Sequence, residues 1–282
     1  MNRALRNALF FHTGFRMALS GSVYRTEIKA CTAFRSRQKN ERRKRGSRRD
    51  RLDGCFMRNN IAIDGPAGAG KSTIAKKVAK AVSAIYVDTG AMYRAMALLM
   101  IKKGIEPSDT EGIERSCDEA DISIEYQDGA QHVFLNGEDV TDRLRTEAVG
   151  NMASASSGNA KVRAKLVELQ QKLAKKVPVV MDGRDIGTVV LPDAELKIYL
   201  TADVRTRAMR RYQELLEKQG AGEAAPVLEM IEQDIRERDE RDMNRANSPL
   251  RKAEDAVLLD SSDLTPDEVT ERILGLAAER AY

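Results

Sequence analysis

The chain has 282 residues, of which 32% are charged and 42% hydrophobic, and its formal net charge is +4. Its 3 cysteines and 2 histidines argue against a disulfide framework and a histidine-ligated metal, and no apolar run reaches the roughly 18 residues that cross a membrane. We therefore expect a protein of the reducing cytoplasm with no membrane partner.

The first 57 residues differ in composition from the rest. They hold 12 Arg and 3 Lys against 2 Glu and 2 Asp, a net charge of +11, which leaves −7 on residues 58–282. A segment so charged cannot bury a core of its own, so we expect a disordered extension followed by one domain over residues 58–282. Three interpretations stay open: a basic tail that contacts nucleic acid, a transit peptide, or a start codon assigned too early, with Met57 as the natural start.

A glycine-rich segment follows the first expected strand. Residues 60–64 form a short run with β-branched side chains, which predicts a buried strand, and residues 72–82 carry apolar side chains at helical spacing. Between them the sequence fits G-x-x-x-x-G-K-[ST], the phosphate-binding loop of nucleoside-triphosphate enzymes. Lys71 can reach the β- and γ-phosphates and Ser72 can hold a magnesium ion, while backbone N–H groups close around the polyphosphate at a helix N-terminus. The residues expected to bind it are Gly65, Pro66, Ala67, Gly68, Ala69, Gly70, Lys71, Ser72 and Thr73.

Strands and helices are expected to alternate along the rest of the chain. We predict further strands at residues 85–88, 177–182, 196–200 and 256–260, helices at 91–102 and 160–176, two charged helices within 205–245, and a final helix capped by Thr265 and Pro266. This alternation predicts an α/β fold with a parallel, doubly wound sheet and its ligand at the carboxyl ends of the strands. Residues 122–126 and 132–135, with residues 140–141 after them, predict a small antiparallel hairpin or three-stranded sheet, which we interpret as an insertion.

Charged residues cluster at the end of the third core strand. Asp182 stands where a carboxylate that organises magnesium is often found, although an aspartate that begins a turn would look the same. Arg184 and Asp185 follow between two glycines. A structural turn needs the glycines but not the charges, and a guanidinium holds phosphate through its planar fork, so we favour a functional role.

A second basic cluster lies in residues 236–245. On one helix, Arg238, Asp242 and Arg245 would share a face. A solvated helix with ion pairs one turn apart is the simpler explanation. Phosphoryl transfer offers the alternative, because it needs cations around the transferred group.

These blocks together resemble bacterial cytidylate kinases. The resemblance rests on GPAGAGKST, VDTGAMYRA, NMASASSGNAKVR, GRDIGTVVLPDAELKIYLTA and ERDERDMNRANSPL in this order, and it runs from about residue 57 to the C-terminus. It implies a P-loop kinase core, a small β-rich nucleoside-monophosphate-binding insert at about 116–150 and a helical lid at about 205–240. Residues 1–57 match nothing in the family pattern.

The resemblance also implies a reaction. ATP with Mg²⁺ would pass its γ-phosphate in line to CMP or dCMP, as part of pyrimidine nucleotide metabolism. The catalytic residues would be Lys71, Asp182, Arg184 and Arg245, with Ser72 at the metal. Ser154, Arg163 and Asp185 would read the cytosine ring, Arg94, Arg184 and Arg245 would clamp the acceptor phosphate, and Arg238 and Asp242 would hold the sugar. The implied CMP-binding set is Thr89, Arg94, Ser154, Arg163, Arg184, Asp185, Arg238, Asp242 and Arg245.

Two other functions are compatible with the phosphate-binding loop. One is a kinase for another nucleotide or a small-molecule acceptor, against which the set Ser154, Arg163 and Asp185 argues. The other is a nucleotide-gated protein that binds nucleic acid through residues 1–57, which the acidic remainder of the chain does not support. We expect a monomer whose partners are ATP and CMP or dCMP.

Overall fold

The computed structural model describes residues 60–127, 130–218 and 226–280. The expected extension at residues 1–57 lies outside the described residues, and so does the segment 219–225 between the two charged helices. In the described part of the chain, no helix has the length and apolar character needed to cross a membrane.

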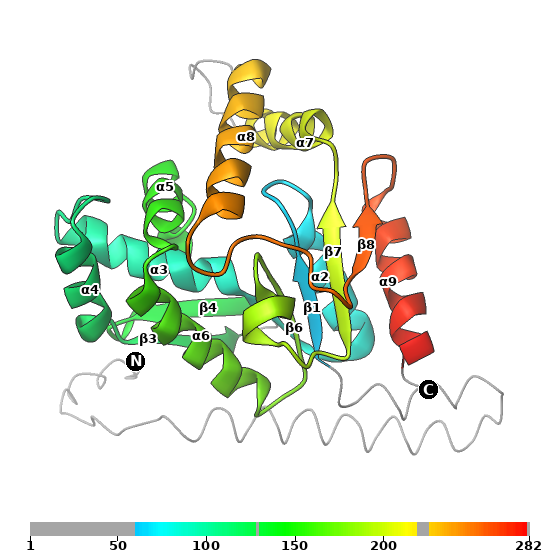
Figure 1. Ribbon diagram of the computed structural model, residues 1–282, viewed down its shortest axis with the longest axis horizontal. Coiled ribbons are helices and arrows are strands. Elements are labelled where there is room, and N and C mark those ends of the chain that lie inside the picture. The colour runs from blue at the N-terminus through cyan, green and yellow to red at the C-terminus, as the bar shows by residue number, and fades with distance from the viewer. Residues whose placement is uncertain (1–59, 128–129, 219–225, 281–282) are drawn as a thin grey trace, which may run out of the picture. The chain divides into compact units, whose positions relative to one another are not determined.

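A parallel sheet forms the centre of the fold (Figure 1). Within the described residues it has five strands in the order β2-β6-β1-β7-β8, and every neighbouring pair is parallel. The strands are β1 (Ile61–Asp64), β2 (Ile85–Asp88), β6 (Val179–Gly183), β7 (Leu196–Thr201) and β8 (Val257–Asp260). The predicted parallel α/β sheet is confirmed. The structure adds the order of the strands, which the alternation of strands and helices along the sequence could not specify.

Helices cover both faces of this sheet. On one face Ile61 and Ile63 of β1 pack against α2 (Lys71–Val82) and α9 (Pro266–Arg280). On the other face Ala62 joins a cluster with α6 (Ala160–Ala174) and the π-helical turn η4 (Ile186–Val190). Because alternate residues of a strand point to opposite faces, one short apolar run contributes to both cores.

The final helix begins as predicted. The Thr265 hydroxyl accepts from the N–H of Glu268 at 3.3 Å, and the Glu268 carboxylate accepts from the N–H of Thr265 at 2.8 Å. This reciprocal cap satisfies two backbone donors, and Pro266 occupies the first helical position, where its missing N–H costs nothing.

A smaller unit is inserted after α3 (Thr89–Lys102). The strands β3 (Ile122–Gln127), β4 (Ala130–Leu135) and β5 (Glu138–Asp139) form an antiparallel sheet, which confirms the predicted hairpin, and the short turn η3 (Thr141–Arg143) follows. Two helices that were not predicted, α4 (Thr110–Glu119) and α5 (Glu147–Ser156), share a separate apolar core with α3 and this sheet. Both begin at polar caps, Asp109 and Thr146.

Two charged helices lie beyond the carboxyl ends of the strands (Figure 1). They are α7 (Val204–Lys218) and α8 (Leu228–Asn244), and they pack against each other. The prediction that Arg245 lies on this helix is wrong, because α8 ends at Asn244 and Arg245 has an extended backbone (φ −63°, ψ 141°). The chain turns back there, with the N–H of Leu250 donating to the carbonyl of Asp242 at 2.8 Å.

Candidate functional site

The loop between β1 and α2 depends on its glycines. Gly68 and Gly70 have φ values of 75° and 82°, which other residues rarely adopt. At Gly65 a Cβ would lie 1.9 Å from the carbonyl oxygen of Leu200, so the loop passes too close to β7 for any side chain. The loop ends on the N-terminus of α2, where backbone N–H groups and the helix dipole attract an anion.

Lys71 is buried at the first position of α2. Its ammonium donates to the carbonyl of Pro66 at 2.6 Å, back across the loop. Burial lowers the pKa of Lys71 well below its usual range, and the charge of Arg184 lowers it further. A polyphosphate in the loop would favour the charged ammonium, because an opposite charge nearby stabilises it.

A hydroxyl and a carboxylate meet beside the loop. The Ser72 hydroxyl donates to one oxygen of Asp182 at 2.8 Å, and Tyr86 donates to the other at 2.9 Å. No group of three or more Asp, Glu, His or Cys that would form a complete metal site occurs among the described residues. Mg²⁺ prefers oxygen ligands and is commonly held by one or two carboxylates together with substrate phosphates, so Ser72 and Asp182 fit this ion.

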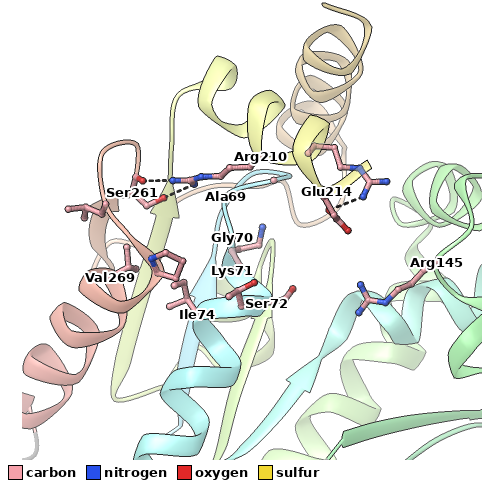
Figure 2. Close-up of a pocket in the computed structure, with 15 residues that line it drawn as sticks. Ala69, Gly70, Lys71, Ser72, Ile74, Arg145, Arg210, Glu214, Ser261 and Val269 are labelled. Carbon is pink, nitrogen blue, oxygen red and sulfur yellow. Dashed lines mark hydrogen bonds and ion pairs between the residues drawn. The ribbon is translucent and has the colours of Figure 1, made fainter. Parts of the chain in front are cut away.

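A cavity of about 460 Å³ opens over the loop. Figure 2 shows the loop at its floor and Arg210 of α7 above it, donating to the carbonyl of Ser261 at 2.6 Å. Leu264 and Val269 add an apolar wall. The combination of a glycine-rich loop at a helix N-terminus and an apolar wall suits a nucleotide. The wall was not predicted, because no sequence motif marks its residues.

A second cavity, of about 230 Å³, adjoins the same loop. It shares Gly68, Lys71 and Ser72 with the first cavity, so the two cavities meet at Lys71. The structure brings together around it every residue that the sequence implied for CMP: Thr89, Arg94, Ser154, Arg163, Arg184, Asp185, Arg238, Asp242 and Arg245. Tyr93 and Asp88 also line it and were missed, although both flank predicted residues in the block from residue 88 to 94.

This second cavity carries an excess of positive charge. The described residues that line it include six basic and four acidic side chains: Lys71, Arg94, Arg163, Arg184, Arg238, Arg245, and Asp88, Asp182, Asp185, Asp242. Burial and the neighbouring Arg184 lower the pKa of Arg238 to about 10. Burial alone would raise the pKa of Asp242, but Arg184, which donates to it at 2.7 Å, and the other arginines lower it. Such a surplus of cations suits a doubly charged anion.

Several buried donors in this cavity have no protein partner. Within the described part of the chain, the Nε atoms of Arg94 and Arg238 and the Oγ of Ser154 make no hydrogen bond. Buried polar atoms are almost always satisfied in folded proteins, because leaving one unpaired costs about 1–3 kcal/mol. These atoms therefore mark places where a polar ligand would bind.

The residues expected to read a pyrimidine lie in one corner of the cavity. Arg163 of α6 forms a buried ion pair with Asp185, and Arg245 approaches the other Asp185 oxygen at 3.7 Å. The Arg163 guanidinium also lies 5.7 Å from the centre of the Tyr93 ring. With the hydroxyl of Ser154, which lines the same cavity, the carboxylate and the fixed guanidinium are complementary to a base with both an amino group and ring acceptors.

Asp64, which the sequence analysis overlooked, holds the segment that carries Arg184 and Asp185. Its two oxygens accept from the N–H groups of Ile186 and Gly187, both at 2.7 Å. Burial raises the pKa of Asp64 to about 6, against the opposing effect of these two hydrogen bonds. The carboxylate at the end of β1 therefore fixes the turn at the end of β6.

Asp64 should make stability depend on pH in a defined window. The pKa of Asp64 is about 6 in the folded chain, above the ordinary 3.8, so the protonated carboxyl favours the folded state. Its contribution to stability is complete below pH 3.8 and is lost as the pH rises through 6. We expect the unfolding free energy of wild type minus that of Asp64→Asn to fall by on the order of 3 kcal/mol between pH 4 and 7 and then level off. Urea unfolding across this range measures it, and a pH-independent difference would contradict the assignment. Asp185 and Lys71 are the charged groups that also act on Asp64.

Comparison with known proteins adds the family. The family model described as cytidylate kinase matches residues 61–279, from β1 into α9, and so includes both cavities. A cytidylate kinase of Caldicellulosiruptor saccharolyticus is 51% identical over 217 residues, which are 77% of this chain and 94% of that protein. A cytidylate kinase of Halalkalibacterium halodurans is 48% identical over 221 residues, which are 78% of this chain and 98% of that protein.

Proposed function

The chain belongs to the cytidylate kinase family and transfers the γ-phosphate of ATP to CMP or dCMP, and we propose that the two cavities that meet at Lys71 hold the two substrates. The first, over the glycine loop, would hold ATP. The second would hold the acceptor. The observation that carries this division is that all nine residues implied for CMP line the second cavity, while Lys71 lines both cavities.

The acceptor phosphate would bind among the arginines of the second cavity. Arg94, Arg184 and Arg245 would clamp it, because guanidinium groups hold phosphate in a planar, bidentate manner. Arg238 and Asp242 would hold the sugar hydroxyls. Asp242 has a further task, since it orients Arg184 through the bond to its Nε.

Transfer of the phosphoryl group would be direct, because ATP would lie on one side of Lys71 and the acceptor on the other. An oxygen of the acceptor phosphate attacks the γ-phosphorus in line as the bond to the β-phosphate oxygen breaks, and no enzyme-bound intermediate forms. Lys71, Arg184 and Arg245 would neutralise the charge that develops on the transferred group, which is the main task of protein residues in phosphoryl transfer. Helices α7 and α8 would act as the lid that keeps water from replacing the acceptor.

The metal, the base and the cellular location complete the proposal. Ser72 and Asp182 would hold Mg²⁺, which would offset the negative charge of the phosphate groups. Ser154 and Asp185 would accept from the cytosine amino group, and Arg163 would donate to its ring acceptors.

We propose that the protein is a monomer in the cytoplasm, where a reducing environment would keep the buried thiol of Cys117 free. The insert would cover about residues 116–150 and the lid about 205–240.

Removal of one acceptor arginine tests the assignment of the cavities. Arg94→Met should raise KM for CMP by about 10- to 100-fold and leave KM for ATP within about twofold, because a charge-assisted hydrogen bond contributes about 1.5–3 kcal/mol. Steady-state kinetics with each substrate varied in turn measure both constants.

Lys102→Met is the matched control. Lys102 lies on the same helix α3 but pairs with Glu138 at 3.0 Å on an exposed surface. It should change neither constant. A rise in KM for ATP instead of CMP in Arg94→Met would show that the cavities are assigned the wrong way round.

A further inference from the structure

A buried ion pair joins the two lid helices at their base. Arg207 of α7 donates to Asp239 of α8 at 2.5 Å, and the two side chains are only 5% and 9% exposed. The Nε of Arg207 also donates to the carbonyl of Ala202 at 2.9 Å, which fixes the guanidinium relative to the end of β7. The position of this pair is therefore set by three elements of the fold.

The same pair binds both polar groups of one residue in the glycine loop. The N–H of Ala67 donates to Asp239 at 3.1 Å, and the carbonyl of Ala67 accepts from Arg207 at 2.8 Å. The next residue, Gly68, packs so closely that a Cβ there would lie 3.2 Å from the Cβ of Arg207. Helices α7 and α8 are thus both tied to the loop at Ala67.

Asp239 is close in sequence to two residues that line the acceptor cavity. It lies between Arg238 and Asp242 on α8, and both of those residues line the second cavity. A displacement of the loop at Ala67 would therefore act on the helix that carries Arg238.

We propose that Arg207 and Asp239 are positioning residues that couple occupancy of the ATP loop to the affinity of the acceptor cavity, an inference that rests on the proposed function of the two cavities. With ATP bound, the loop holds α8 through this pair in the orientation that places Arg238 and Asp242 on CMP. Without the pair, most of this coupling would be lost.

Stability alone is a poor explanation for this arrangement. Burial of two charges costs solvation that their attraction only partly returns, and well-packed apolar residues often replace such pairs without loss. Apolar side chains could not, however, bind the N–H and the carbonyl of Ala67 together. The pair therefore provides directional contacts to the loop in addition to packing.

Calorimetric titration of the full chain with CMP, with and without a non-hydrolysable ATP analogue, tests the coupling. In wild type we expect the analogue to raise CMP affinity by about fivefold or more, the lower end of usual coupling between sites. In the double variant Arg207→Met/Asp239→Leu, which removes both charges and retains apolar volume, this gain should fall below about twofold. Thermal unfolding of the same samples reports whether the fold is intact.

The exposed pair between the same helices provides the control. Glu232 accepts from Arg205 at 2.9 Å, joining α8 to α7 without a contact to the loop. Glu232→Gln should keep the full gain in CMP affinity. If the double variant does not fold, Arg207→Lys supplies the comparison, since it keeps the charge but its three donors sit on one atom and cannot reach Ala202, Ala67 and Asp239 as the planar guanidinium does.

The possible results separate the two claims. A folded double variant, or Arg207→Lys, with the wild-type gain in CMP affinity would overturn the positioning role, and so would a wild type that shows no gain. Failure of the proposed function has a different signature, because wild type itself would then neither bind nor phosphorylate CMP.

Discussion

Replacement of Lys71 by methionine is expected to lower kcat by about a thousandfold while leaving the fold intact. Lys71 is buried at the point where the two cavities meet, and in the proposed arrangement its ammonium would follow the phosphoryl group from donor to acceptor. Methionine retains most of the volume, and burial already disfavours the ammonium in the free protein, so stability should change little. Single-turnover measurement of ADP formation separates this effect from product release.

Lys80→Met is the matched control for Lys71. It lies on the same helix α2 with an exposed side chain and contributes to neither cavity. It should behave as wild type in rate and in thermal unfolding. A Lys71→Met protein with normal structure and a rate within about tenfold of wild type would remove Lys71 from the mechanism.

Asp185→Asn should abolish the preference for cytosine over uracil. Asp185 is buried against Arg163 and Arg245, and an asparagine cannot both accept from a base amino group and balance the two guanidinium charges. We expect kcat/KM for CMP to fall, and the ratio of kcat/KM for CMP to that for UMP to fall by about 10- to 100-fold, since an unpaired buried group costs about 1–3 kcal/mol.

The measurement is kcat/KM for both nucleotides in each variant. Asp255→Asn serves as control, because Asp255 pairs with Lys197 at 2.9 Å outside both cavities. It should leave the ratio unchanged. An unaltered ratio in Asp185→Asn would mean that the base is read elsewhere.

Local patterns were sufficient to predict the parts of the site that lie within one segment of sequence. The strand, the glycine loop and helix α2 are contiguous, so spacing alone placed Lys71 and Ser72. The cap of α9 followed for the same reason, because Thr265 and Glu268 are three residues apart. Residues implied by resemblance, such as Ser154, lie together in the structure although no local pattern marks them.

Contacts between segments far apart in the chain could not be predicted from the sequence. Asp64 binds the N–H of Ile186, 122 positions away, and Asp239 binds that of Ala67, 172 positions away. Neither residue differs in type from the many surface carboxylates of a chain with 43 Asp and Glu, so only the fold reveals that both are buried. The helical periodicity predicted that α8 extends to Arg245. The chain turns at this point instead, and the hydrogen bond from the N–H of Leu250 to the carbonyl of Asp242 joins two segments that the periodicity does not relate.

Parallel assays with different acceptors test the central claim most directly. The initial rate of ADP formation from ATP and Mg²⁺ is measured for the full chain with CMP, dCMP, UMP, AMP and GMP at equal concentration. We expect rapid turnover with CMP and dCMP and much slower turnover with the other three. Equal rates with all five, or no turnover with CMP by a folded chain that binds ATP, would contradict it.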